Sequence, residues 1–247
     1  MTSTNSTSGL EAPGLDPDAA IRFYFRDPDW KIKTALGSLL ICSALLLILS
    51  FKFFLPLFPL AFLLWAVVQG YILRLMRAVI RGSANILPTW DDWLELVVSG
   101  LTWLAILTGQ LMVMATVATL TLIVGGKYGL VNPLSPHFKT WFLISASALS
   151  ATTFVASFFF PLLMANFAEQ EKVLSALSID EALKRLIRKP KEYVTVWLLN
   201  LGIFWLALLL PAITVIGIFF IPLALFLANT LSAILLAQVW RASSTAP

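Results

Sequence analysis

The stretch with the residues best suited to chemistry is Trp-Asp-Asp-Trp at positions 90–93, where two carboxylates lie between two indoles. A pair of carboxylates can hold a metal ion or work as a general acid and a general base. Neighbouring side chains on a helix point about 100° apart, however, so these two carboxylates would not converge on one ligand. A second explanation of the stretch is therefore needed.

A helix start at a membrane surface accounts for every residue of this stretch. Pro88 ends the preceding element, and Thr89 and Asp92 have the spacing of a variant capping box. Acidic side chains favour a helix N-terminus, and tryptophan is enriched at the headgroup level of membranes. We therefore predict an interfacial helix start without a catalytic or metal-binding role. It comprises Thr89, Trp90, Asp91, Asp92 and Trp93.

Two basic clusters could bind anions. The first is a helical stripe with i, i+3, i+7 spacing, formed by Arg74, Arg77 and Arg81. It could form a site for anionic headgroups or phosphate, or it could anchor the chain and pair with the nearby acidic residues; we favour the second alternative. The other cluster can bind anionic lipid at about 1 kcal/mol per charge. Its members are Lys184, Arg185, Arg188, Lys189 and Lys191.

The composition places these clusters in a membrane protein. The 247 residues are 59% hydrophobic and only 12% charged, whereas soluble domains carry roughly 25% charged residues. The modest net charge of +4 then reflects membrane topology, and we expect no nucleic-acid partner. With one cysteine, Cys42, and one histidine, His137, the chain offers neither an internal disulfide nor a cysteine or histidine metal centre, and we expect no cofactor.

Six apolar segments are long enough to cross a bilayer, which requires about 20 residues. We predict an all-α, polytopic membrane protein with three helical hairpins, and with both termini in the cytoplasm. In this topology only three of the 17 lysines and arginines, Lys52, Lys127 and Lys139, fall outside. Residues 1–14 are predicted to be a disordered tail, 15–240 a single helical membrane domain and 241–247 a short C-terminal tail. The predicted segments are 34–51, 59–78, 96–123, 141–164, 193–210 and 216–238.

Short amphipathic segments are predicted to precede the crossings. Asp16 and Asp27 each stand before a proline, as N-caps often do, and Ser178 with Glu181 forms a full capping box. The segment 178–193 is basic and has an apolar face at helical spacing, which is typical of a helix lying along the membrane surface. An interfacial segment followed by two crossings would thus occur three times.

Three stretches carry a resemblance to a known family. They are Phe-Arg-Asp-Pro-Asp-Trp at 25–30, the arginine-rich stretch 70–82 and Leu-Pro-Thr-Trp-Asp-Asp-Trp at 87–93. In this order they resemble an uncharacterised prokaryotic integral-membrane family, domain of unknown function 4013, over roughly residues 20–240. The resemblance implies a plasma membrane or internal membrane location and implies no activity.

Two functions remain open, and an enzyme is the least favoured class because no converging acid and base are visible. The first is a non-enzymatic protein that organises or assists other membrane components. We expect anionic lipids, a membrane-protein partner or a second copy of the chain to bind it. The alternative is a carrier or channel for an apolar or zwitterionic solute or a lipid. Its polar path would use Gln110, Asn166, Asn200 and Asn229.

Overall fold

The computed structural model describes residues 14–244 except 51–54, 83–85, 131, 133, 174–177 and 215. These residues form helices and turns and no strand, which confirms the all-α prediction for the described part of the chain. The predicted N-terminal tail lies outside the described residues, apart from Gly14. The helices are α1 (Pro17–Arg26), α2 (Trp30–Leu49), η1 (Leu55–Leu57), α3 (Phe58–Ile80), α4 (Trp93–Lys127), α5 (Phe138–Gln170), α7 (Ile179–Arg188), α8 (Pro190–Ala212), η2 (Gly217–Phe220) and α9 (Ile221–Ser244).

Within the described residues, six helical segments are long and apolar enough to cross a membrane, and each overlaps one of the six predicted segments. The long apolar run that begins near residue 193 is divided, as predicted, shortly after Pro211: α8 ends at Ala212 and η2 begins at Gly217. The helix α9 continues to Ser244, so the start of the predicted C-terminal tail is helical.

Two helices exceed the predicted crossings. The helix α4 has 35 residues and α5 has 33, against the predicted 96–123 and 141–164. At about 1.5 Å per residue each is about 50 Å long, which is more than the ~30 Å hydrocarbon core of a bilayer. Each helix must therefore tilt or extend beyond that core if it crosses a membrane.

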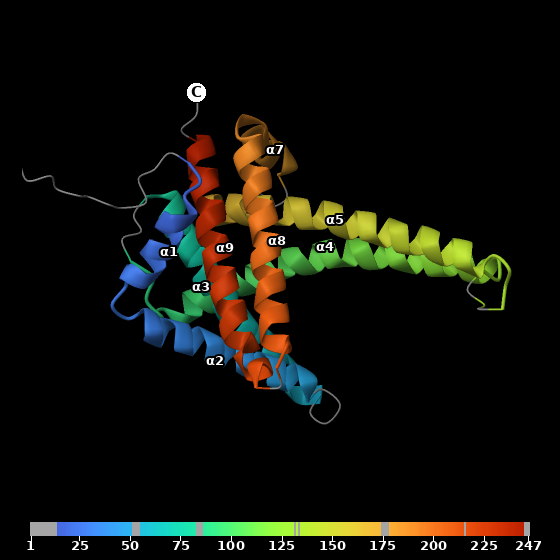
Figure 1. Cartoon of the computed structure of the whole chain (residues 1–247), viewed down its shortest axis with the longest axis horizontal. Helices are drawn as coiled ribbons and strands as arrows, with labels where there is room; N and C mark the ends of the chain where they lie inside the picture. The colour runs from blue at the N-terminus through green and yellow to red at the C-terminus, as the bar shows by residue number, and fades with distance from the viewer. Residues whose placement is uncertain are drawn as a thin grey trace, which may run out of the picture. The chain divides into compact units, whose positions relative to one another are not determined.

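The residue contacts divide the chain into two compact units. The first contains the residues up to Trp103 and from Leu163 onward, and the second contains 104–162. In the first unit α9 packs against α2, α3 and α8, and α2 packs against α3 (Figure 1). Its core is formed largely by the second half of α3 and the second half of α9, where most side chains are buried.

Two glycines allow α3 and the start of α4 to pack backbone to backbone within the first unit. A Cβ atom at Gly70 would overlap the carbonyl oxygen of Leu96, and one at Gly100 would overlap that of Ala66. Small residues at such positions permit close helix packing. This contact fixes the position of the loop that joins the two helices, which contains the Trp-Asp-Asp-Trp stretch.

The second unit is a hairpin formed by the remainder of α4 and most of α5, which run antiparallel in Figure 1. Its turn contains Gly129 with a positive φ of 65°, and the ring of Trp141 lies against Gly125. Many of its large apolar side chains are exposed, among them Met112, Leu122 and Phe142. Such a surface is suited to an apolar environment.

Of the N-caps predicted at Asp16 and Ser178, only the one at Asp16 is confirmed. Asp16 caps α1, because its carboxylate accepts a hydrogen bond of 2.8 Å from the Ala19 N–H. Ser178 occupies the N-cap position of α7, but its side chain makes no capping hydrogen bond, so the predicted capping box is wrong. Its partner Glu181 instead accepts a hydrogen bond from Gln170.

Candidate functional site

The arginine stripe of α3 lies against three carboxylates. Arg74 contacts Asp91 at 2.5 Å and Glu95 at 2.8 Å. Arg77 contacts Glu95 at 3.4 Å and Glu171 at 3.0 Å, and Arg81 contacts Glu171 at 2.6 Å. Three guanidinium groups thus face three carboxylates, and this geometry matches the ion-pairing alternative rather than an open phosphate site.

This ionic network joins three parts of the first unit: α3, the beginning of α4 with its preceding loop, and the end of α5. Arg77 also donates to the Ala168 carbonyl oxygen at 3.3 Å, near the last turn of α5. The carboxylates are about half exposed, so each pair by itself contributes little to stability. The arrangement serves mainly to set the positions of these three segments.

The Trp-Asp-Asp-Trp stretch differs from the predicted capping box. The helix begins at Trp93 and not after Thr89, because Asp92 has a left-handed backbone with φ of 48°. The Leu96 N–H donates to the Asp92 carbonyl oxygen, which forms the first turn of α4. A hydrogen bond from the Thr89 side chain, together with the Arg74 guanidinium, lowers the pKa of the Asp91 carboxyl. Asp91 therefore remains an ionised partner of Arg74.

The two tryptophans of the stretch have different surroundings. Trp93 is 45% exposed, which suits the predicted interfacial position. Trp90 instead stacks on Tyr71 of α3, with ring centroids 4.0 Å apart, and its indole N–H donates to the Lys33 carbonyl oxygen at 3.2 Å. The Trp90 side chain therefore connects the loop to α2 and α3.

A buried ion pair lies beside this stack, and the sequence reasoning missed it. Asp27 was predicted to be an N-cap, but its carboxylate is fully buried and contacts the Lys33 ammonium at 2.6 Å. Lys33 also donates to the Leu87 carbonyl oxygen at 2.8 Å. A buried carboxylate requires a charged partner. Lys33, six residues further along the chain, provides that partner for Asp27. Lys33 thus links the stretch 25–30 to the stretch 87–93, which contacts 70–82 through Trp90 and Tyr71.

Tyr24 of α1 extends this buried polar cluster. Its hydroxyl shares a hydrogen bond with the Thr34 hydroxyl, and burial raises the pKa of the phenol. The hydroxyl of Tyr71, which is also buried, has no hydrogen-bond partner among the described residues. The cluster connects the end of α1 to α2 and, through Lys33, to Leu87 in the segment before α4.

The basic helix α7 is fixed to the first unit by Arg185. Its guanidinium contacts the Glu169 carboxylate at 2.7 Å and lies 4.6 Å from the ring centroid of Trp240. The Trp240 indole N–H donates to the same carboxylate at 3.0 Å. Arg185 therefore faces the protein, and its role differs from that predicted for a lipid-facing cluster. Glu169 and Trp240 were not among the predicted site residues, since they lie at the ends of apolar runs.

The other members of this cluster are divided between structural and outward positions. Arg188 donates to the Ser243 carbonyl oxygen at 3.3 Å, and Lys189 contacts Glu192 at 3.2 Å. Lys184 and Lys191 are exposed. The predicted basic cluster therefore exposes mainly Lys184 and Lys191, and Arg188 is exposed in part.

The amide side chains proposed for a polar path make separate contacts. Asn166 accepts a hydrogen bond from Gln170 at 2.9 Å, and Asn229 donates to the Leu225 carbonyl oxygen of its own helix at 2.8 Å. Asn200 is buried, and its side-chain oxygen has no hydrogen-bond partner in the described part of the chain. The side chain of Gln110 lies outside the described residues. The described amides thus serve individual helices or helix contacts.

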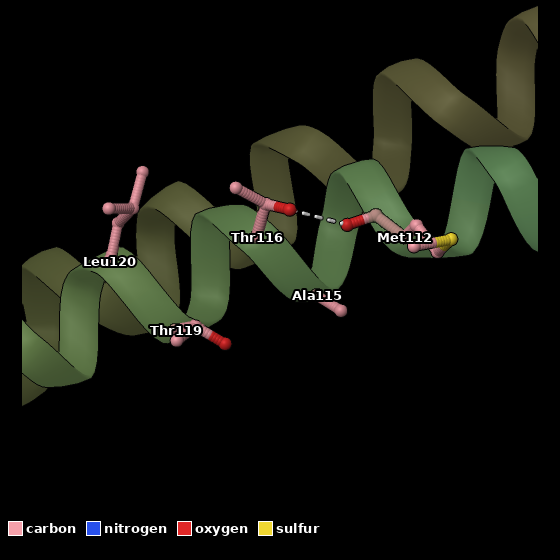
Figure 2. Close-up of a pocket in the computed structure, with 5 residues that line it drawn as sticks. All are labelled: Met112, Ala115, Thr116, Thr119 and Leu120. Carbon is pink, nitrogen blue, oxygen red and sulfur yellow. Dashed lines mark hydrogen bonds between the residues drawn. The ribbon is translucent and has the colours of Figure 1, made fainter.

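A groove of about 270 Å³ lies on the α4 part of the second unit (Figure 2). One helix provides its lining, and Thr116 donates its hydroxyl proton to the Met112 carbonyl oxygen at 2.8 Å. Since this hydroxyl already has a backbone acceptor, the groove offers little polar chemistry. Its lining residues are Met112, Ala115, Thr116, Thr119 and Leu120.

Comparisons with known proteins give one finding. Neither the curated proteins nor the solved structures gave a match. A family model described as "Protein of unknown function (DUF4013)" matches residues 53–220, which is more than half of the chain. This range contains the arginine stripe, the Trp-Asp-Asp-Trp stretch and α7, and it confirms the resemblance seen in the sequence. The chain therefore belongs to the DUF4013 family of proteins of unknown function.

Proposed function

We propose that this protein is a multi-pass membrane protein that organises or assists other membrane components and catalyses no reaction. The proposal is carried by one observation: two groups of charged side chains in the first unit pair with each other and hold its own segments together. Asp91, Glu95 and Glu171 bind the arginine stripe, and Glu169 binds Arg185. An active site would instead need an acid or base directed at a substrate.

The location follows from the six apolar helices and the distribution of charge. The described part of the chain contains six helical segments that are long and apolar enough to cross a membrane. Residues in or near the predicted cytoplasmic ends of the crossings contact each other: Asp16 bonds Gln238, Arg77 contacts Glu171, and Arg188 bonds Ser243. We place this charged end in the cytoplasm of a prokaryotic cell, at the plasma membrane or an internal membrane.

The contacts of the amide side chains favour this function over a carrier. A carrier that binds a polar group near the middle of the bilayer requires several polar side chains around a common space. Asn166 instead accepts a hydrogen bond from Gln170 of the same helix, and Asn229 donates one to the Leu225 carbonyl oxygen of its own helix.

The proposal can be tested by purifying the tagged chain from native membranes in mild detergent and identifying bound proteins by mass spectrometry. A stoichiometric protein partner, absent from an equally tagged unrelated multi-pass protein, would support it. The purified chain would also be reconstituted into liposomes and assayed for solute flux and lipid scrambling. Transport above that of the unrelated protein would contradict the proposal and favour the carrier.

A further inference from the structure

Two short helices of the first unit share a sequence pattern. Residues 21–26 read Ile-Arg-Phe-Tyr-Phe-Arg, and residues 183–188 read Leu-Lys-Arg-Leu-Ile-Arg. In both, an apolar residue followed by a basic residue occurs twice, four positions apart. In both, a proline stands two residues after the last basic residue of the pattern. A long apolar helix begins at that proline or two residues after it.

The first helix presents this pattern to the outside. In α1, Ile21 and Phe25 are 46% and 53% exposed, and the neighbouring Arg22 is exposed as well. The opposite side of the helix packs into the unit through Phe23 and Tyr24, which are buried. The outward face therefore combines apolar and basic side chains along the same helix.

The second helix has the same arrangement. In α7, Ile187 is 73% exposed and Ile179 is 50% exposed, and Lys184 is exposed beside them. Ala182 and Arg185 are turned toward the protein. Exposed isoleucines on a helix that also carries an exposed lysine indicate a surface that contacts both an apolar phase and negatively charged groups.

The C-terminal end of α9 contacts both α1 and α7. Asp16, the cap of α1, bonds the Gln238 side chain through its N–H at 3.2 Å, and its carbonyl oxygen accepts from the same side chain at 3.3 Å. Further along α9, the Trp240 ring lies against Arg185 of α7. The Ser243 carbonyl oxygen accepts a hydrogen bond from Arg188 of the same helix. In Figure 1, α9 runs between α1 and α7. Both amphipathic helices are thus fixed to the same end of one helix.

We infer that α1 and α7 form one docking surface for the anionic phospholipid headgroups of the membrane in which the protein lies. The basic residues Arg22 and Lys184 would bind headgroup phosphates, while Ile21, Phe25 and Ile187 enter the boundary with the acyl chains. Charge complementarity and the adjacent apolar side chains favour this partner. The inference rests on the membrane location in the proposed function and adds the ligand class and its residues.

The test uses the full chain in detergent, titrated with short-chain phosphatidylglycerol or phosphatidylcholine and followed by native mass spectrometry. The double variant Arg22→Gln/Lys184→Gln removes two charges from the docking surface. The matched control Lys127→Gln/Lys139→Gln removes two charges from the second unit. We expect phosphatidylglycerol binding to weaken about fivefold per charge in the first variant, with little change in the control. Phosphatidylcholine binding should be unchanged in both.

Other outcomes would overturn the inference. Equal weakening in both variants would indicate a general effect of net charge. Equal binding of the two lipids by the unchanged protein would show that no anionic surface exists. Loss of a co-purified protein from the docking-surface variant, with lipid binding unchanged, would assign α1 and α7 to a protein partner; this result would leave the proposed organising function intact.

Discussion

At the scale of single residues, the most consequential feature is the buried pair of Asp27 and Lys33. Its two side chains are 0% and 8% exposed, and both take part in further hydrogen bonds. A buried ion pair need not stabilise a protein relative to apolar residues, but the loss of one partner leaves an uncompensated charge. The pair is therefore expected to specify how α1, α2 and the loop before α4 meet.

The variant Lys33→Met should lower the free energy of unfolding by about 3–5 kcal/mol, because it leaves the Asp27 carboxylate buried without a counter-charge. Lys31→Met is the matched control, since Lys31 is exposed on the same turn. Thermal or denaturant unfolding in detergent would measure both. The double variant Asp27→Leu/Lys33→Met should recover part of the loss. An equal loss in the Lys31 and Lys33 variants would show that the pair has no special role.

Asp91 gives a pH prediction. Its pKa is lowered by Thr89 and then by Arg74, so these contacts are complete above the ordinary pKa of an aspartate and are lost as the pH falls through the lowered value. Thr89→Val should move the pKa of Asp91 upward, as followed by carboxyl NMR of labelled protein in micelles. Arg81→Gln should leave it in place, since Arg81 binds Glu171 instead. An unchanged pKa in Thr89→Val would disprove the role assigned to Thr89.

At the scale of helices, packing of α3 on α4 depends on glycine. Gly70→Ala and Gly100→Ala should each destabilise the chain by about 1–3 kcal/mol, because the new Cβ atom would overlap a backbone carbonyl of the other helix. Gly202→Ala is the control, since nothing lies within 4 Å of a Cβ atom there. It should be neutral or slightly stabilising, because alanine favours a helix. Unfolding in detergent distinguishes them, and equal effects at the three positions would contradict the close packing.

The attachment of α7 gives a second prediction at this scale. Arg185→Gln removes the contact with Glu169 and the position over Trp240, which together are worth on the order of 2 kcal/mol. Amide hydrogen exchange in residues 179–188 should therefore become about thirtyfold faster. Lys184→Gln removes an exposed charge from the same helix and should leave the exchange unchanged. If both variants behave alike, Arg185 does not hold the helix.

At the scale of the whole molecule, the sequence predicts the helical class, the six apolar segments and the break after Pro211, because each depends on local composition. The partners of individual charged residues could not be predicted in the same way. Asp27 has the sequence context of an N-cap, and only the position of Lys33 and Leu87 in the folded unit shows why it is buried. Arg185 lies in a basic run, yet the end of α9 determines that it faces inward.

The ionic network could be predicted from the sequence only in part. The spacing of Arg74, Arg77 and Arg81 predicts one stripe, and the acidic residues after the next loop suggest partners for it. Glu171 lies 90 residues further along the chain than Arg81, so its contact depends on how α5 packs against α3. Local spacing therefore identifies the stripe, and tertiary packing decides which carboxylates it binds.

The topology predicted from the distribution of lysine and arginine puts Ser244 in the cytoplasm and Tyr128 outside the membrane. Cysteine accessibility in intact cells tests it directly, after Cys42→Ser has removed the native thiol. An impermeant maleimide added from outside should label Tyr128→Cys in the turn, and it should label Ser244→Cys at the end of α9 only after the cells are opened. Labelling of both positions in intact cells, or of Ser244→Cys alone, would contradict the account.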